Sequence, residues 1–191
     1  MSKGKLFAIS GASGVGKSTV LSKVMAARED LRFSVSATTR PPRPGEQEAV
    51  NYYFVSREEF EDMIAKGAFL EYDEHAGNYY GTPWAQLKEK LERGNVILDV
   101  EPNGAFNVRR KDPGAVLIFI MPPSRAELER RLRSRGDTSE EQIRMRLARA
   151  SWEMEQSERY DYVVVNDQVD ACADAILKII AQRADNEDGG M

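Results

Sequence analysis

The feature that most constrains this chain is an eight-residue segment near its beginning. Residues 11 to 18 read Gly-Ala-Ser-Gly-Val-Gly-Lys-Ser and satisfy the pattern G-x-x-x-x-G-K-[ST] in full. Glycines in this pattern let backbone N–H groups surround phosphate oxygens, the lysine brings positive charge to the β- and γ-phosphates, and the serine hydroxyl can ligate Mg²⁺. The pattern predicts a phosphate-binding loop formed by Gly11, Ala12, Ser13, Gly14, Val15, Gly16, Lys17, Ser18 and the following Thr19.

The residues on both sides of this loop support the same interpretation. Residues 6 to 9 form a short apolar run typical of a strand, and residues 19 to 25 carry apolar side chains at helical spacing. A strand, a glycine-rich loop and a helix in this order direct the positive end of the helix dipole at bound phosphates. This context disfavours the alternative, a glycine-rich turn with an incidental lysine, and we expect the chain to bind a nucleoside triphosphate.

Further apolar runs predict strands at residues 6–10, 33–37, 96–100, 116–121 and 162–165. Most of these runs are continuous, as expected for strands that are buried on both faces of a parallel sheet. Helical patterns alternate with them. Capping boxes at Ser56, Ser124 and Ser139 predict three helix starts, and Thr82 before Pro83 predicts an N-cap for another. The alternation indicates an α/β fold of the P-loop NTPase type, with three layers around a parallel sheet.

Two stretches depart from this alternation. Residues 34–81 hold short segments rich in Tyr and Thr, which predict a small mixed or antiparallel insertion. Residues 125–150 hold two charged helical patterns joined through a glycine turn, which predict a helical lid. We therefore expect a core of residues 1–33 and 82–184 that includes the lid, an insertion of residues 34–81, and a polar, disordered tail of residues 185–191.

Composition narrows the possible partners. The chain has 191 residues and a net charge of −4, which argues against general affinity for nucleic acid. No apolar run approaches the ~20 residues that span a membrane, and the residues before the first strand leave no room for a signal peptide. We expect a cytoplasmic enzyme without a membrane partner, and the sequence leaves open whether it forms a homo-oligomer. The single cysteine, Cys172, reads as a core residue rather than a nucleophile.

Positive charge is concentrated between residues 125 and 149, which contain eight arginines and five acidic residues. Such a segment suits a small polyanionic ligand. The alternative is a solvated helix face with many ion pairs. We favour this alternative for Arg125, Arg130, Arg133, Arg144 and Arg149.

Residues 38 to 46 read Thr-Thr-Arg-Pro-Pro-Arg-Pro-Gly-Glu and hold two arginines on a proline-rich frame. In a polyproline II conformation, with three residues per turn and ~3.1 Å rise, Arg40 and Arg43 would project from one side, ~9 Å apart. Two guanidinium groups held in this way can grip one phosphate with little loss of entropy. The alternative is a linker with incidental arginines.

Six segments, taken in order and at their spacing, resemble the guanylate kinase family over nearly the whole chain. They are residues 11–18, 33–46, 78–82, 97–101, 131–136 and 163–167. The resemblance implies phosphoryl transfer from ATP to GMP, which gives ADP and GDP and requires Mg²⁺.

The resemblance also implies a GMP site. It places the ligands of the GMP phosphate at Arg40, Arg43, Tyr52 and Tyr80 and the ligands of guanine at Ser36, Glu71 and Thr82. The chemistry of guanine agrees, because a Glu71 carboxylate can accept from the N1 and N2 donors while the two hydroxyl groups donate to O6. Adenine lacks the N2 donor and would leave Glu71 unpaired. For Thr82, the role of a helix N-cap remains the alternative.

The family's catalytic cations correspond to Lys17, Arg40, Arg131, Arg135 and Arg146, which would surround the transferring phosphoryl group. Ser18 is the implied Mg²⁺ ligand, and Asp99 can reach the metal through water. Asp99 and Glu101 are also assigned to the GMP site, with Glu101 serving either the metal shell or guanine. Asn166 is implied near the adenine of ATP, with a turn residue as the alternative.

The chain departs from the family after the strand at 96–100. There the family usually has Gln-Gly without a proline, and this chain has Pro102-Asn103-Gly104, which leaves the role of Asn103 and the path of the turn open.

Three other functions fit the sequence less well. A GTPase would need an N-K-x-D motif, which residues 166–169 do not supply. A kinase for another small phosphate or nucleotide is disfavoured by the guanine-reading residues. A non-catalytic binding module of the same fold typically loses the phosphate loop or its lysine, and this chain keeps both.

Overall fold

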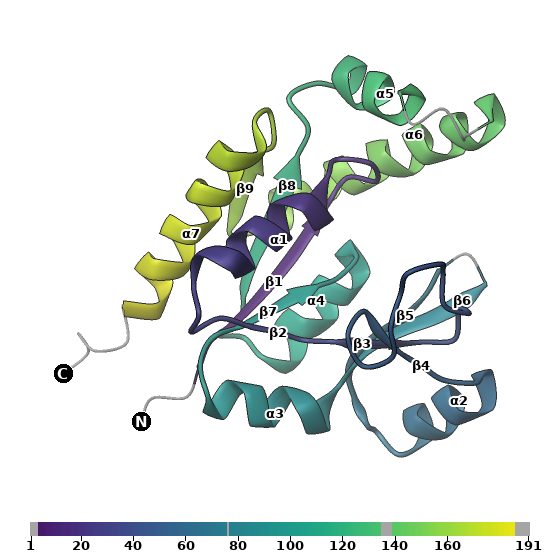
Figure 1. Cartoon of the computed structure of the whole chain (residues 1–191), viewed down its shortest axis with the longest axis vertical. Helices are drawn as coiled ribbons and strands as arrows, with labels where there is room; N and C mark the ends of the chain where they lie inside the picture. The colour runs from purple at the N-terminus through teal and green to yellow at the C-terminus, as the bar shows by residue number, and fades with distance from the viewer. Residues whose placement is uncertain (1–3, 76, 135–138, 186–191) are drawn as a thin grey trace. The chain divides into compact units, whose positions relative to one another are not determined.

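The structure is a computed structural model, and it describes residues 4–75, 77–134 and 139–185 (Figure 1). The chain divides into two compact units, one formed by residues 1–8 and 30–115 and the other by residues 9–29 and 116–191. The boundary falls within the first strand, β1 (Leu6–Gly11). No described helix combines the length and the apolar character that crossing a membrane requires.

A five-stranded parallel sheet has the order β2-β7-β1-β8-β9. Its other strands are β2 (Arg32–Phe33), β7 (Val96–Asp99), β8 (Val116–Met121) and β9 (Tyr162–Val165). All residues of β1, and all of β8 except the last, are buried, as the continuous apolar runs predict. The predicted α/β class with a parallel sheet is confirmed.

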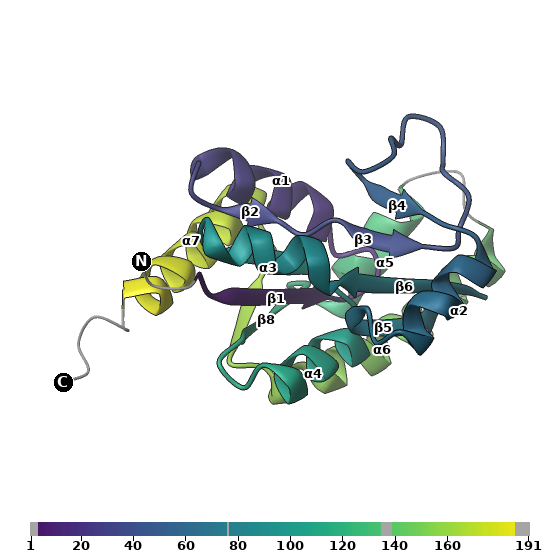
Figure 2. The ribbon, with the colours of Figure 1, turned by 90° about the horizontal axis from the view of Figure 1, so that it is seen from below.

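The second unit also contains helices. These are α1 (Lys17–Ala27), α5 (Arg125–Arg133), α6 (Glu140–Glu155), the 3₁₀ helix η1 (Gln156–Arg159) and α7 (Val169–Asp185). Helices α1 and α7 pack side by side, as both views show (Figures 1 and 2). Cys172 of α7 is buried, and this burial raises the pKa of its thiol to about 11, which fits the predicted core role.

The first unit contains a four-stranded sheet of order β4-β3-β6-β5. Its strands are β3 (Ser36–Thr38), β4 (Tyr52–Phe54), β5 (Phe69–His75) and β6 (Asn78–Pro83). Strands β3 and β4 are parallel and the other pairs are antiparallel, so the sheet is mixed. Phe60 of α2 (Arg57–Ala65) stacks on Phe69 with ring centroids 4.3 Å apart, and together with Ala37 they form the buried centre of this part.

Two more helices complete the first unit. They are α3 (Trp84–Glu92), which follows β6, and α4 (Pro102–Lys111), which follows β7 and packs on β5 (Figure 2). Helix α4 brings its first turn to the strand that carries Glu71, and this arrangement positions one of the two candidate sites.

The strand expected at residues 33–37 is two strands that belong to different sheets. The N–H of Ser34 donates to the carbonyl of Ile97, which is the last bond to β7, and the chain then enters β3 of the mixed sheet. The segment Phe-Ser-Val-Ser-Ala alternates apolar and polar residues as one strand would, and this pattern does not reveal that its two ends pair with different neighbours. The single strand was therefore a wrong prediction.

Two helix starts differ from the expectation. Thr82 is not an N-cap: it lies in β6, and α3 begins two residues later with Pro83 as its N-cap residue. Ser124 does accept the N–H of Glu127, but the Glu127 carboxylate binds arginines of its own helix and does not return the bond. The capping boxes at Ser56 and Ser139 are both confirmed.

Candidate active site

The phosphate-binding loop lies between the end of β1 at Gly11 and the start of α1 at Lys17. Gly14 and Gly16 have φ of 87° and 93°, in the left-handed region that favours glycine. Gly16 is the N-cap residue of α1, so no side-chain oxygen takes the position that a phosphate oxygen would occupy. The strand, loop and helix required by the sequence pattern are all present.

Packing explains one of these glycines further. A Cβ at Gly14 would lie 2.6 Å from Cδ2 of Leu132 on α5, so any larger residue would require the Leu132 side chain to move. The loop backbone is also closed by two bonds: the N–H of Ala12 donates to Ile120 of β8 at 3.3 Å, and the N–H of Val15 donates to Ala12 at 2.9 Å. These two bonds give the loop a defined shape.

Side chains from distant segments support the loop. Nδ2 of Asn166, a buried residue after β9, donates to the Val15 carbonyl at 2.8 Å. Oε2 of Glu153 on α6 accepts the Ser13 N–H at 2.6 Å. The structure thus places Asn166 against the loop itself, and its expected role near adenine stays a prediction.

The expected lid arginines lie in three different situations. Arg131 is half-buried and donates to the carbonyls of Asn166 at 2.9 Å and Asp167 at 3.3 Å. Arg146 is exposed on α6. Arg135 lies outside the described residues. Their role in catalysis stays a prediction.

Several neighbouring arginines form the ion pairs that the alternative interpretation predicts. Arg130 pairs with Glu127, Arg133 pairs with Glu129 and Glu140, and Arg149 pairs with Glu153. The pKa of Glu127 falls to about 2, because it accepts hydrogen bonds from Arg130 and then from Arg131. Much of the positive charge of this segment is therefore neutralised locally.

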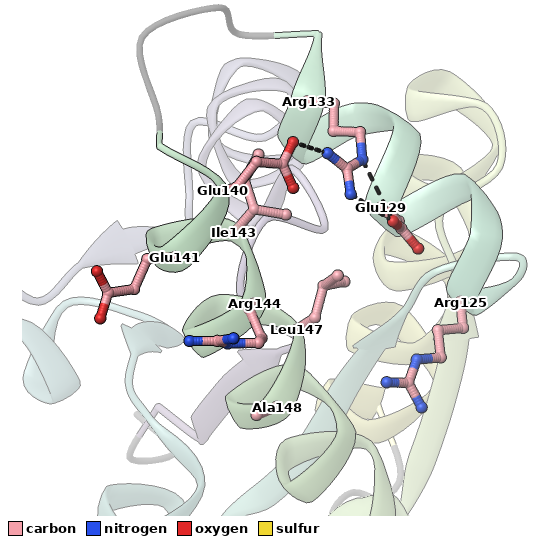
Figure 3. Close-up of a pocket in the computed structure, with 9 residues that line it drawn as sticks. All are labelled: Arg125, Glu129, Arg133, Glu140, Glu141, Ile143, Arg144, Leu147 and Ala148. Carbon is pink, nitrogen blue, oxygen red and sulfur yellow. Dashed lines mark hydrogen bonds and ion pairs between the residues drawn. The ribbon is translucent and has the colours of Figure 1, made fainter.

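A hollow of about 630 Å³ lies between α5 and α6 (Figure 3). Its charged lining residues are Arg125, Arg133, Arg144, Glu129, Glu140 and Glu141. Three acidic and three basic side chains balance, and Arg133 is already paired with two of the acids, as the dashed lines show. This hollow consequently gives no preference for a polyanion and is not our candidate site.

A buried carboxylate defines the second candidate site, in the first unit. Glu71 of β5 is only 5% exposed, and its Oε1 accepts the hydroxyl of Thr82 on the paired strand β6 at 2.6 Å. On the other side, a Cβ at Gly104 of α4 would lie 2.7 Å from Glu71 Oε2. Glycine at position 104 therefore makes room for the carboxylate beside the first turn of α4.

Burial changes the acidity of Glu71. It raises the pKa of the carboxyl group to about 7, against the lowering effect of the hydrogen bond from Thr82. The group is thus divided between its two protonation states near neutral pH. A ligand that offers two N–H donors would favour the ionised form, so its binding should release a proton.

Arg40 is the centre of a cluster of aromatic and charged groups. Its guanidinium carbon lies 5.4 Å from the ring centroid of Tyr52, whose ring is 6.0 Å from that of Tyr80. The guanidinium donates to both oxygens of Glu46, at 2.8 and 2.9 Å, and Glu46 also accepts the backbone N–H of Arg43 at 2.7 Å. These bonds, led by that from Arg40, lower the pKa of Glu46 to about 2. The cluster thus holds a planar anion in bidentate geometry.

Two further residues expected to bind GMP are Ser36, in the mixed sheet, and Arg43, on the loop that follows Arg40. Ser36 begins β3 and is opposite Tyr52 in the parallel β3–β4 pair. The Arg43 side chain is exposed on the loop after Arg40, and the structure leaves its contact with phosphate a prediction.

The turn after β7 explains the departure from the family pattern. Asp99 ends the strand, Glu101 is the N-cap residue of α4, and Pro102 is the first residue of the helix, where its fixed φ and missing N–H are tolerated. Asn103 donates from Nδ2 to Asp73 of β5 at 3.2 Å. Asn103 therefore ties α4 to the strand that carries Glu71. The role of Glu101 at the metal shell or at guanine stays a prediction.

Three residues of these sites were missed by the sequence reasoning. Glu46 follows the Arg-Pro-Pro-Arg-Pro-Gly segment, and its acidity beside two arginines was a usable signal. Glu153 stands four residues after Arg149, which indicates a helical ion pair but not that the acid is buried. Gly104 gives no local signal, because its importance comes from its distance to Glu71.

Comparisons with known proteins identify the family of this chain. A family model described as "Guanylate kinase" matches residues 3–183. Curated guanylate kinases from Prochlorococcus marinus and Thermus thermophilus are 47% and 50% identical over 177 and 183 residues, which cover 92% and 95% of this chain and 96% and 83% of those proteins. The crystal structure of guanylate kinase from Anaplasma phagocytophilum is 36% identical and has a TM-score of 0.80, covering 96% of this chain and 88% of that one. The chain therefore belongs to the guanylate kinase family.

Proposed function

We propose that this guanylate kinase, which transfers a phosphoryl group from ATP to GMP, uses one set of residues for each substrate. The phosphate-binding loop would hold ATP. The surroundings of Glu71 and Arg40 would hold GMP. The observation that carries the assignment of GMP is the buried Glu71 carboxylate, which receives the Thr82 hydroxyl and is bordered by Gly104.

Guanine suits this carboxylate because its N1–H and N2–H groups are adjacent donors. The carboxylate has two oxygens and can accept both, while its burial makes an unpaired charge costly. A base without both donors would leave the ionised carboxylate short of one hydrogen bond. The site would therefore discriminate between bases in two ways: guanine gains the hydrogen bond, and any other base incurs the free-energy cost of a buried, incompletely paired charge. Ser36 and Thr82 would add contacts at the O6 edge, with Thr82 also bound to Glu71.

The GMP phosphate would bind at Arg40, Arg43, Tyr52 and Tyr80. Support comes from Glu46, whose carboxylate is held by the Arg40 guanidinium and an Arg43 N–H as a phosphate would be held. In this proposal the phosphate either displaces Glu46 or joins it on the other face of the arginines. No strong general base is needed, because a phosphate monoester is already largely an oxyanion near neutral pH.

ATP would place its β- and γ-phosphates on the loop at residues 11–19, beside the start of α1. Lys17, Arg131, Arg135 and Arg146, with Arg40 from the GMP side, would supply the positive charge that stabilises the transferring phosphoryl group. Lys17 stands at the first residue of α1, where the helix dipole adds to its charge.

Mg²⁺ is the expected cofactor, and the donors fit its chemistry. Ser18 offers a hydroxyl and Asp99 a carboxylate, which are hard oxygen ligands. Within residues 4–75, 77–134 and 139–185 there is no group of three or more His, Cys, Asp or Glu that could hold a metal ion. In kinases, substrate phosphates and water supply most of the Mg²⁺ ligands. When bound, the ion would neutralise charge on the phosphates.

A panel of nucleoside monophosphates tests the proposal. We would measure ADP release with ATP, Mg²⁺ and each of GMP, IMP, AMP and UMP. The expected result is a kcat/KM for GMP well above the other three, with IMP second because it lacks only the N2 donor. Equal rates with AMP and GMP would overturn the assignment of Glu71 to guanine. The cytoplasmic location and the oligomeric state stay predictions.

A further inference from the structure

We infer that Glu153, on α6, positions the phosphate-binding loop for ATP through the backbone N–H of Ser13. This inference rests on the proposed assignment of ATP to the loop. It concerns a residue that touches the loop backbone rather than the substrate.

The contacts of Glu153 are specific to its two oxygens. Oε2 accepts the Ser13 N–H at 2.6 Å, a bond that joins residues 140 positions apart in the chain. Oε1 accepts Nε of Arg149, one helical turn earlier, at 2.7 Å. The side chain is 1% exposed, whereas that of Arg149 is 28% exposed. Glu153 is therefore a buried anion held between a half-buried cation and the loop backbone.

This burial is unusual for a helix whose other acids face solvent. Glu155, two residues later, is exposed on the same helix. Removing a carboxylate from water carries a large cost in free energy, which only good partners offset. A hydrogen bond from a backbone N–H to an ionised acceptor is stronger than a neutral one. The Ser13 bond therefore fixes the loop far more firmly than an ordinary contact.

Ser13 is the residue just before Gly14, where the backbone enters the left-handed region. Fixing the Ser13 N–H fixes the plane of the peptide group that precedes this turn. The next residues, through Gly16, carry the loop to the start of α1. A change at Glu153 would thus rotate N–H groups that the ATP phosphates need, without removing any group that touches ATP.

The same helix carries Arg146, which the proposed function assigns to the phosphates. Arg149 and Glu153 follow it at intervals of three and four residues, so the three lie along one side of α6. Glu153 would connect this helix directly to the loop through its hydrogen bond with the Ser13 N–H. We expect the binding of ATP, but not that of GMP, to depend on it.

The test is Glu153→Gln, which keeps the size and shape of the side chain. The Ser13 N–H and the Arg149 guanidinium are bound by different oxygens of Glu153. An amide has only one oxygen, and the NH₂ group in place of the other is a donor, so the two bonds cannot both be kept in their present positions. We expect KM for ATP to rise about tenfold and KM for GMP to stay within twofold of wild type, at a temperature well below the unfolding midpoint. Glu155→Gln removes the same charge from the exposed side of the helix and should leave both constants unchanged.

Equal increases in both KM values, or no change in either, would overturn the inference. A merely structural role would lower the unfolding midpoint without separating the two substrates. An NMR measurement on the wild-type protein guards against a variant that fails to fold. The Ser13 amide proton should exchange slowly and appear far downfield, and rapid exchange with an ordinary shift would also overturn the inference. This measurement does not depend on activity, so it separates failure of the inference from failure of the proposed function.

Discussion

Gly104→Ala is the most direct test of how the guanine site is built. The added Cβ would lie 2.7 Å from Glu71 Oε2 and 3.3 Å from Cβ of Val100. The first distance is too short for any real contact, so the carboxylate must move. Because Oε1 of Glu71 holds the Thr82 hydroxyl at 2.6 Å, this movement should also stretch or break that hydrogen bond.

The magnitude follows from the two bonds that guanine would make. A good bidentate contact to a base contributes ~1–3 kcal/mol of discrimination, and a carboxylate displaced by about an ångström should lose most of it. We expect kcat/KM for GMP to fall by about 5- to 150-fold. Stability should change less, because alanine favours a helix by ~1 kcal/mol over glycine and this gain offsets the lost hydrogen bond.

Steady-state kinetics with GMP and with IMP, together with thermal unfolding, would check this prediction. The loss should be larger for GMP than for IMP, which offers one donor fewer. Gly114→Ala is the matched control: a Cβ there meets only Asp112 Oδ1 at 3.4 Å, so its kinetics should equal those of wild type. A GMP kcat/KM within twofold of wild type in Gly104→Ala would refute the assignment of this carboxylate to guanine.

Three further predictions concern the same sites. Lys17→Met should abolish turnover while GMP binding, measured by calorimetry, stays nearly unchanged; equal loss of both with an intact fold would contradict its role. Glu71→Gln should lower kcat/KM for GMP at least tenfold (~1.4 kcal/mol) and narrow the GMP/IMP ratio with ATP affinity unchanged. Since the Glu71 pKa is about 7 and guanine needs the ionised form, GMP affinity should rise about tenfold from pH ~6 to ~8. Glu71→Gln should show only the smaller dependence of the GMP phosphate, whose own pKa is ~6, and an identical profile in both proteins would disprove the linkage.

Local patterns predicted those parts of the fold that local physics decides. The runs at 116–121 and 162–165 became β8 and β9 with those bounds. Strand β8 is apolar because all of it except the last residue is buried in the parallel sheet. Strand β9 lies at the edge of the sheet, where Val163 and Val165 are 47% and 51% exposed, so burial does not explain their apolar character. The phosphate-binding loop could also be predicted, since its left-handed glycines and its lysine are requirements of the backbone and of the ligand.

Features that depend on pairing between distant segments could not be predicted in this way. Thr82 followed by proline has the local signature of an N-cap, yet its hydroxyl is bound to Glu71 across the β5–β6 pair. The run at 33–37 gives no sign that its two halves join different sheets. In both cases the decisive partner is far away in the chain, and a tertiary bond overrides the local preference.

In the candidate site, too, some features could be predicted from the sequence and others depend on distant contacts. The types of residue were predictable, because phosphate requires cations and guanine requires an acceptor for its two donors. The family resemblance then gave the positions of these residues in the sequence. The state of each residue was not: Arg40 is engaged with Glu46, Asn166 supports Val15, and Arg131 lies against backbone carbonyls. These contacts decide how much each group must move before it can act, and they arise only from the folded arrangement.

Each unit contains a buried carboxylate, and burial has a different consequence for each of them. Glu71 and Glu153 are 5% and 1% exposed, and each gives one oxygen to a partner inside the protein: Thr82 for the former and Arg149 for the latter. They differ at the second oxygen. In Glu153 it accepts the Ser13 N–H, so each carboxylate oxygen has a partner within the protein and one of these partners belongs to the loop. In Glu71 the second oxygen faces the glycine at position 104. The pKa of about 7 indicates that burial makes the ionised form of this carboxyl group unfavourable. Because a donor pair from guanine would remove that cost, the same burial that stabilises a loop in one unit would supply base selectivity in the other.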